Sequence, residues 1–458
     1  MASPSLGPWE PMAGDRRVTS GDDGLIELAS SAPVEPKGPA DAITGLNASP
    51  AGDPDQPVVQ TGGFQPTSGS TDVLTGQASD TQVFTDKQLY IVTLEDGDRP
   101  LSDRAREVLG GVQPQALLKN LGMVTAELTS AQAAALQRRN GVLRVEADQV
   151  VTLDLPRAAA PPPGKGPGGG GSTEPTEPSS EILDWGVKAV WGDQDRRSHS
   201  FSFSNQRAFV LDTGISANTG DLNFNTTDSK DFTGSRSGFY DRQGHGTHVA
   251  GTIAAQANGR GVVGVAPNAE VVSIKVLNDR GSGTISGIIA GIDSMISVAG
   301  VGDVANMSLG GGFSQSLNDA VLKAATSSQK IRFAIAAGNS YKDVDAYSPA
   351  SVGDFSKGIY TISAHDINKR NASFTNFDNF GGADVDNVAY AAPGVNITSL
   401  KIDGTTVAYN GTSMAAPHVA GLLLIGDFRY TTTSTTFGEL ATAYRSETTD
   451  PLAITNLG

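Results

Sequence analysis

The sequence predicts an α/β protein built on a parallel sheet, preceded by a small α+β domain. From residue 181 onward, short runs of β-branched and aromatic residues alternate with helical stretches, which is typical of a parallel sheet with helices on both faces. Between residues 86 and 153, strand-like and helical stretches follow one another over a shorter span. A segment rich in proline and glycine separates the two regions, so we expect two folded domains joined by a linker.

The N-terminal region, residues 1–85, is rich in Gly, Pro, Ser, Asp and Thr and has almost no aromatic residues. Such a segment cannot bury enough apolar surface to offset its chain entropy, so we expect it to be disordered. The first 24 residues lack the apolar stretch of a signal peptide. No run of 18 apolar residues occurs in the sequence, which predicts no membrane-spanning helix.

The small α+β domain is predicted over residues 86–153. It begins near Lys87 with the strand QLYIVTLEDG, followed by a helical stretch and a second strand. We expect a helix over Ala131–Arg139 with Ser130 as its cap, then a turn at Asn140-Gly141. The final strand, LRVEADQVVTL, runs into the linker.

The predicted linker covers residues 154–180. Within it, residues 156–180 contain 7 prolines and 6 glycines in 25 positions. We expect it to be stiff at its proline-rich start and flexible through its glycines.

The larger domain is predicted over residues 181–458. Its expected strands are 207–211, 270–276, 304–308, 332–337 and 359–364, and its expected helices are 246–257, 285–298, 315–327 and 414–424. The Thr-rich segment after residue 425 shows no clear closing strand or helix. In parallel sheets, functional sites form at the carboxyl ends of the strands.

Charge and cysteine content exclude several functional classes. The net charge is −16. Since 26 acidic and 20 basic residues lie from residue 181 onward, −6 belongs to that region and −10 to the residues before it. A chain this acidic repels phosphate backbones and anionic lipids, so we expect no nucleic-acid or membrane partner. The absence of cysteine excludes a disulfide framework, a thiolate nucleophile and a Cys-based zinc site.

Three segments combine a reactive residue with small neighbours. They are FVLDTG with Asp212, GHGTHVAGT with His245, and NGTSMAAPHVAG with Ser413. A serine hydroxyl needs an adjacent base to become a nucleophile, and histidine suits that role because its ordinary pKa is near ~6.5. The histidine in turn needs a carboxylate to fix its tautomer. The three residues therefore form a candidate catalytic set.

With NMSLGG and AAGN, these segments resemble the motif set of the subtilisin-like serine proteases, in the same order Asp, His, Ser. The resemblance implies a subtilisin-like three-layer fold and a serine endopeptidase that forms an acyl-enzyme on Ser413. It implies that Asp212 orients His245, that His245 is the general base and then the acid, and that Asn339 is the oxyanion-hole donor. It also implies substrate-binding segments and a pocket wall, made by Gly281, Ser282, Gly283, Ser308, Leu309, Gly310, Ala336, Ala337 and Gly338.

The same resemblance implies a structural calcium site and no organic cofactor. The ligands would be the Asp221 carboxylate, the Asn258 side chain, and the carbonyls of Gln256, Arg260 and Val262, an all-oxygen set of the kind that calcium prefers. Glu181 would be a further ligand. An ordinary loop remains the alternative for Asp221 and Asn258.

The 86–153 segment resembles the inhibitor-type propeptides that precede many subtilisin-like catalytic domains, which are small α+β, ferredoxin-like domains. The resemblance implies a zymogen whose partners are its own propeptide and polypeptide substrates. We expect an extracellular or cell-surface monomer, with cleavage between about Val150 and Ser180, preferably just after Val151.

Several alternatives are weaker. His245 and His248 form an H-x-x-H pair, but no third metal ligand accompanies it, and we interpret His248 and His418 as packing residues. GRGVVG at 259–264 fits a dinucleotide fingerprint but follows a helix and precedes a strand, so we reject it. An esterase would place its nucleophile in G-x-S-x-G, which GTSMA does not match. A catalytically inactive binding or inhibitory protein with this fold remains the main alternative.

Overall fold

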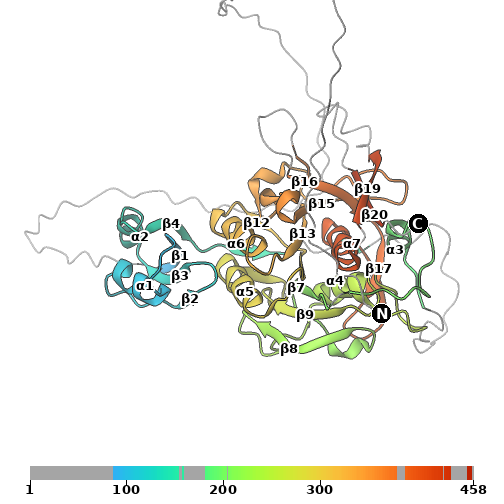
Figure 1. The fold of residues 1–458 in the computed structure, drawn as a ribbon, viewed down its shortest axis with the longest axis horizontal. Helices are drawn as coiled ribbons and strands as arrows, with labels where there is room; N and C mark the ends of the chain where they lie inside the picture. The colour runs from blue at the N-terminus through green and yellow to red at the C-terminus, as the bar shows by residue number, and fades with distance from the viewer. Residues whose placement is uncertain are drawn as a thin grey trace, which may run out of the picture. The chain divides into compact units, whose positions relative to one another are not determined.

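The computed structural model describes residues 86–153, 157–158, 181–203, 205–378, 387–426, 428–434 and 451–455 (Figure 1). The predicted disorder of residues 1–85 and most of the predicted linker lie outside these residues.

A nine-stranded sheet forms the centre of the larger domain, in the order β19-β20-β16-β15-β13-β11-β7-β9-β8. The seven strands from β16 to β8 are joined by parallel pairings, as predicted. Their bounds are β7 Ala208–Asp212, β8 Asn223–Asp231, β9 Glu270–Lys275, β11 Val304–Met307, β13 Arg332–Ala336, β15 Ile359–His365 and β16 Val388–Pro393.

Helices cover both faces of this sheet. Strand β7 shows the division, because Ala208 and Val210 join one buried cluster while Phe209 and Leu211 join another on the opposite face. The first cluster contains residues of α3 (Trp185–Val190), α4 (His245–Ala254) and α7 (Thr412–Ile425), and the second those of α5 (Ile285–Val298) and α6 (Gln315–Ala325). Figure 1 shows the two helix groups on either side of the strands. The predicted three-layer α/β fold is confirmed.

Three parts of this sheet differ from the expectation, and one is strand β16, where no strand was predicted. Strands β19 (Phe428–Ser434) and β20 (Pro451–Thr455) lie in the Thr-rich segment, where no clear strand was expected. Strand β8 was also not predicted, because its sequence NFNTTDSKD lacks apolar alternation. It lies at the sheet edge, where polar residues are tolerated and discourage pairing with other chains.

Residues 86–153 form a four-stranded antiparallel sheet in the order β2-β3-β1-β4, with two helices. The β-α-β-β-α-β succession is that of a ferredoxin-like domain. Its elements are β1 Gln88–Leu94, α1 Leu101–Leu109, β2 Ala116–Leu118, β3 Met123–Leu128, α2 Ser130–Leu136 and β4 Val142–Ala147. The predicted cap was wrong by one residue. Thr129 caps α2, because Thr129 and Gln132 exchange side-chain-to-backbone hydrogen bonds in a capping box.

The chain leaving this domain pairs with the larger one. Strand β5 (Val150–Thr152) is antiparallel to β10 (Ser282–Thr284), with Val151 opposite Gly283. Within the predicted linker, β6 (Arg157–Ala158) pairs with β18 (Thr406–Asn410), which pairs with β17 (Ile397–Leu400). Two short strands, β12 (Gly311–Gly312) and β14 (Tyr347–Ser348), pair with each other. Four 3-10 helices complete the described elements: Ala217–Thr219, Val344–Ala346, Ala350–Val352 and Phe355–Lys357.

Candidate active site

Asp212 and His245 form a fully buried carboxylate–imidazole pair. Asp212 is the last residue of β7 and His245 the first residue of α4, and His245 Nδ1 lies 2.8 and 2.9 Å from the two carboxylate oxygens. Helix α4 can approach this closely because a Cβ on Gly246 would lie 2.2 Å from the Gly214 carbonyl. The carboxylate thus fixes the tautomer with the proton on Nδ1, which leaves Nε2 as the basic atom.

The pKa of His245 is raised. Burial alone would lower it by disfavouring the charged imidazolium, but the negative charge and the hydrogen bond of Asp212 outweigh burial, with a further contribution from Asp241. Among the described residues, the buried Nε2 atom has no hydrogen-bond partner. The pair is therefore a base with its accepting atom free.

Ser413 is the second residue of α7 and is 7% exposed. Its hydroxyl donates to the Ser308 carbonyl at 3.2 Å rather than to His245. Helices α4 and α7 pack in the same buried cluster, which brings the helix beginning with His245 against the one that carries Ser413. The N-terminus of α7 favours negative charge near the Ser413 oxygen.

Pro417 changes the hydrogen bonding of this helix. It lies inside α7 and has no N–H to donate to the carbonyl four residues earlier, which is that of Ser413. The Ser308 hydroxyl donates to that carbonyl instead, at 2.8 Å. The Ser308 hydroxyl therefore supplies to the Ser413 carbonyl the hydrogen bond that Pro417 cannot donate.

Asn339 follows β13 and faces the start of α7. Its Oδ1 accepts from Thr412 N at 2.8 Å and from Thr412 Oγ1 at 3.0 Å. These bonds fix the amide plane, and its Nδ2 group makes no hydrogen bond to the described residues. Nδ2 is thus an oriented donor beside Ser413.

A cleft of about 220 Å³ contains Ser413 and Asn339. Six residues expected to bind substrate line it: Ser308, Leu309, Gly310, Ala336, Ala337 and Gly338. Gly281, Ser282 and Gly283 do not line this cleft but lie where β5 pairs with β10, and Leu153 N donates to Gly281 O at 2.9 Å. Sequence reasoning missed other lining residues. Some directly adjoin predicted ones, namely Gly311, Gly312, Ser340 and Thr412, and the others come from separate segments: Thr152, Leu153, Tyr347, Ala350 and Asn376.

The residues expected to bind calcium lie together around Asp221. The carboxylate accepts from Asn258 Nδ2 at 2.7 Å and from Val262 N at 3.3 Å, while Gln256 N donates to the Asp221 carbonyl. Burial raises the pKa of Asp221 to about 6, more than its hydrogen bonds lower it. A Cβ on Gly261 would lie 2.3 Å from Asp221 Oδ2, so the loop can lie this close to the carboxylate only because residue 261 is a glycine.

Other titratable groups fall into two sets. Burial lowers the pKa values of His248 and His418 to about 3, and each ring donates to main-chain carbonyls, as expected for packing residues. The carboxylates of Asp343, Asp345 and Asp378 have oxygens within 4.8 Å of one another, a cluster that was not predicted from the sequence because Asp378 lies 33 residues after Asp345.

Comparison with known proteins gives consistent matches. A model of the subtilase family matches residues 209–427. Proteinase R of Parengyodontium album is 33% identical over 343 residues, covering 73% of this chain and 77% of that protein. Subtilisin DY of Bacillus licheniformis is 38% identical over 258 residues, covering 56% and 88%. Alkaline serine exoprotease A of Vibrio alginolyticus is 39% identical over 246 residues, covering 52% of this chain but only 43% of that protein.

Proposed function

The chain belongs to the subtilase family of serine-type endopeptidases, and from this premise we propose that it hydrolyses extended polypeptides through an acyl-enzyme on Ser413. One observation carries the proposal. The buried Asp212–His245 pair presents an unpartnered Nε2 on a helix packed against the one that carries Ser413. The carboxylate partner distinguishes His245 from His248 and His418, whose rings also have one nitrogen without a partner but bond only to main-chain carbonyls.

The catalytic roles follow from the chemistry of the three groups. When the Ser413 hydroxyl turns from the Ser308 carbonyl toward His245, Nε2 takes its proton as the oxygen attacks the substrate carbonyl. The same proton then passes to the leaving amine, and water repeats the sequence to release the acid. Asp212 stabilises the imidazolium that forms in acylation and again in deacylation.

The oxyanion of each tetrahedral intermediate needs donors that are already in place. Asn339 Nδ2 is held for this by the two bonds that Oδ1 accepts from Thr412. The N–H of Ser413, in the first turn of α7, is the second donor in this proposal.

Substrate main chain would pair with β10 and with the strand end at Ser308–Gly310, as β5 pairs with β10 in the structure. Main-chain pairing does not depend on the side chains of the substrate, which supports activity on many extended sequences. The cleft then sets side-chain preference through its small wall residues Ala336 and Ala337.

We also propose that residues 86–153 keep the precursor inactive. Two carboxylates of this domain bind helix starts of the larger one. Glu146 accepts from Ser316 N and Oγ at 3.0 and 2.8 Å in α6, and Asp148 accepts from the N and Oγ of Ser286 in α5. With β5 on β10, these contacts support a product-like segment seated on the substrate strand.

We also propose a structural calcium ion among the oxygen atoms around Asp221. The donor set would be the Asp221 carboxylate, the amide oxygen of Asn258 after rotation of its amide, and the carbonyls of Gln256, Arg260 and Val262. A cation would neutralise the buried carboxylate, which supports the proposal. Its role would be stability, since no catalytic group lies among the ligands.

We propose an extracellular or cell-surface monomer on the resemblance alone. In the described part of the chain, no helix has the length and apolar character needed to cross a bilayer.

The function is tested on casein with and without a serine-directed phosphonate. Casein cleavage that the phosphonate abolishes is the expected result. A folded protein that leaves casein uncut after the precursor has been processed favours the inactive scaffold instead.

A further inference from the structure

Thr213, the residue after Asp212, is held by two buried charged side chains. Its hydroxyl donates to Asp241 Oδ1 at 3.0 Å, and its carbonyl accepts from the Lys275 ammonium. Asp241 is 3% exposed and Lys275 is fully buried. Buried charges are costly unless well hydrogen-bonded, so two of them on one residue fix its position strongly.

Asp241 accepts five hydrogen bonds. Four come from the start of α4: Gln243 N at 2.9 Å, Gly244 N at 2.9 Å, Thr247 N at 3.0 Å and Thr247 Oγ1 at 2.6 Å. The helix has Gly244 at its N-cap, which offers no side chain for capping. Asp241 thus supplies from the preceding loop the acceptor that satisfies the free N–H groups of a helix beginning with His245.

A chain of bonds connects Asp241 to the two catalytic side chains. Thr213 Oγ1 donates to Asp241 and accepts from Gly246 N at 2.9 Å, while Thr213 N donates to Asp212 Oδ1 at 2.6 Å. The end of β7 and the first turn of α4 are therefore joined through one hydroxyl. Loss of that hydroxyl or of its acceptor would let the Asp212 carboxylate and the His245 ring move relative to each other.

We propose that Asp241 is a positioning residue of this peptidase, which sets the Asp212–His245 geometry through Thr213 and through the first turn of α4. The inference rests on the proposed function. It gives Asp241, which is not one of the candidate catalytic residues, a part in the reaction.

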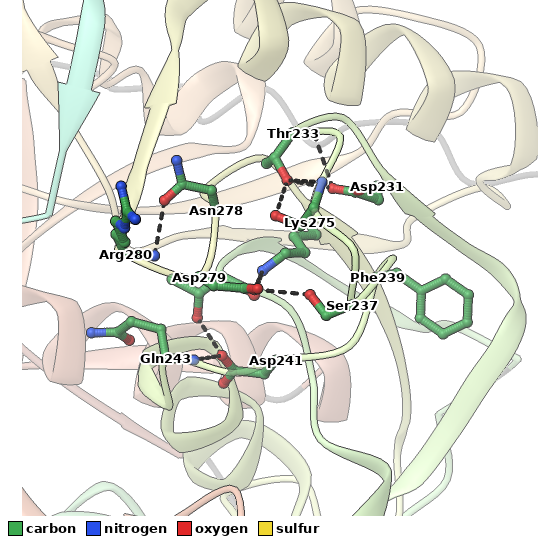
Figure 2. A network of polar contacts seen from close by, with 12 residues as sticks. Asp231, Thr233, Ser237, Phe239, Asp241, Gln243, Lys275, Asn278, Asp279 and Arg280 are labelled. Carbon is green, nitrogen blue, oxygen red and sulfur yellow. Dashed lines mark hydrogen bonds and ion pairs between the residues drawn. The ribbon is translucent and has the colours of Figure 1, made fainter.

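Asp241 differs from the other groups that hold Thr213 in the net charge that it places near His245. The titratable groups facing His245 are Asp212 on β7, Asp241 before α4, and His248 one turn along α4, and the Asp241 charge helps to raise the His245 pKa. Figure 2 shows Lys275 reaching Asp279, with Asp241 and Gln243 nearby. The Lys275–Asp279 ion pair at 3.0 Å compensates the lysine charge, so Lys275 holds Thr213 without adding a net charge at His245.

Four variants of the full-length chain test the proposal. Asp241→Asn removes the charge and alters the bonds, Thr213→Val removes only the connecting hydroxyl, and Thr213→Ser keeps it. Asp354→Asn is the matched control, because Asp354 also caps a short helix but lies on the surface at 27% side-chain exposure. Each variant is quantified by active-site titration and assayed on a peptide anilide across pH.

We expect Asp241→Asn and Thr213→Val to lower kcat about 10- to 100-fold with little change in KM, since small misplacements of catalytic groups have effects of this size. Asp241→Asn should also move the acid limb of the kcat/KM profile to lower pH, because imidazolium loses a stabilising charge. Thr213→Val should move the limb less than Asp241→Asn does, because it keeps the Asp241 charge, and Thr213→Ser and Asp354→Asn should match the wild type.

A merely structural role would lower the unfolding temperature of Asp241→Asn and leave its kcat and acid limb unchanged, which overturns the proposal. If Asp241→Asn does not fold, the contrast between Thr213→Val and Thr213→Ser decides. If the wild-type chain is inactive, the proposed function fails, and low-field proton NMR of the His245 Nδ1–H still tests the positioning. A resonance unchanged in Asp241→Asn and Thr213→Val would overturn it.

Discussion

Ser308 and Ser413 exchange two hydrogen bonds. The Ser308 hydroxyl donates to the Ser413 carbonyl at 2.8 Å, and the Ser413 hydroxyl donates to the Ser308 carbonyl at 3.2 Å. The first bond replaces the helical bond that Pro417 cannot make. The second keeps the proposed nucleophile turned away from His245. The cleft wall and the nucleophile are thus coupled through their main chains.

Ser413→Ala should abolish hydrolysis without unfolding the protein. The change removes the hydroxyl and one hydrogen bond to Ser308, and leaves the bond from the Ser308 hydroxyl to residue 413 intact. Loss of a triad member typically lowers kcat by ~10⁴ or more. The check is turnover of a peptide anilide together with thermal unfolding. A variant that keeps more than ~1% of wild-type kcat contradicts the role of Ser413.

Ser308→Ala should destabilise the fold by about 1–3 kcal/mol, because the buried Ser413 carbonyl loses its donor. Adding Pro417→Ala restores an N–H at position 417, so the double variant should recover part of this loss. Urea unfolding of both single variants and the double variant measures the coupling. Strictly additive effects on the free energy of unfolding would show that the missing N–H of Pro417 and the Ser308 hydroxyl are not coupled.

The sequence predicted the site better than its surroundings. Asp212, His245 and Ser413 lie in short contiguous motifs whose small residues permit close approach, as at Gly246, so each motif is complete by itself. The cleft wall is not contained in one motif. Asn376 supports it from a distant segment, because its Nδ2 donates to Ala337 O and its Oδ1 accepts from Ser340 N. Strand β8 was missed for a different reason, since a polar edge strand carries no periodic apolar signal.

The pH dependence of activity should reflect a raised His245 pKa. Only neutral imidazole can accept the Ser413 proton, so kcat/KM falls as pH drops through this pKa. Because Asp212 outweighs burial and stabilises the imidazolium, the acid limb should have its midpoint above ~6.5. Asp212→Asn should move the limb to lower pH and reduce kcat about 10⁴-fold. A wild-type midpoint below ~6.5 would contradict the inferred balance.

Calcium should stabilise the folded chain. A ligand that binds only the native state at 100 times its Kd adds about 2.7 kcal/mol to the free energy of unfolding. Asp221→Asn should reduce this gain, because the proposed site loses a carboxylate charge. Asp343→Asn is the matched control, since Asp343 lies in the separate acidic cluster. If chelation leaves the unfolding temperature of the wild type unchanged, the calcium site is wrong; if only Asp343→Asn reduces the gain, the ion binds elsewhere.

The last prediction concerns the precursor, in which residues 86–153 should inhibit the larger domain until they are cut away. Strand β5 lies on β10, and Val151 and Leu153 are buried in the same cluster as core residues of the larger domain. A substrate therefore cannot pair with β10 while β5 is there. The linker keeps the two domains at high effective concentration, so inhibition should be strong before cleavage and weaker after it.

Full-length Ser413→Ala expressed alone should remain uncut, and added wild-type enzyme should cut it between about Val150 and Ser180. Glu146→Gln and Asp148→Asn each weaken a charged contact worth about 1.5–3 kcal/mol, so each should ease inhibition about tenfold or more. Glu127→Gln, on an exposed position of the same domain, is the control. Initial rates on a peptide anilide before and after processing measure the effect. Processing of Ser413→Ala by itself would point to another protease, and full activity of the uncut wild-type chain would refute the inhibition, because β5 could not then be blocking the substrate strand.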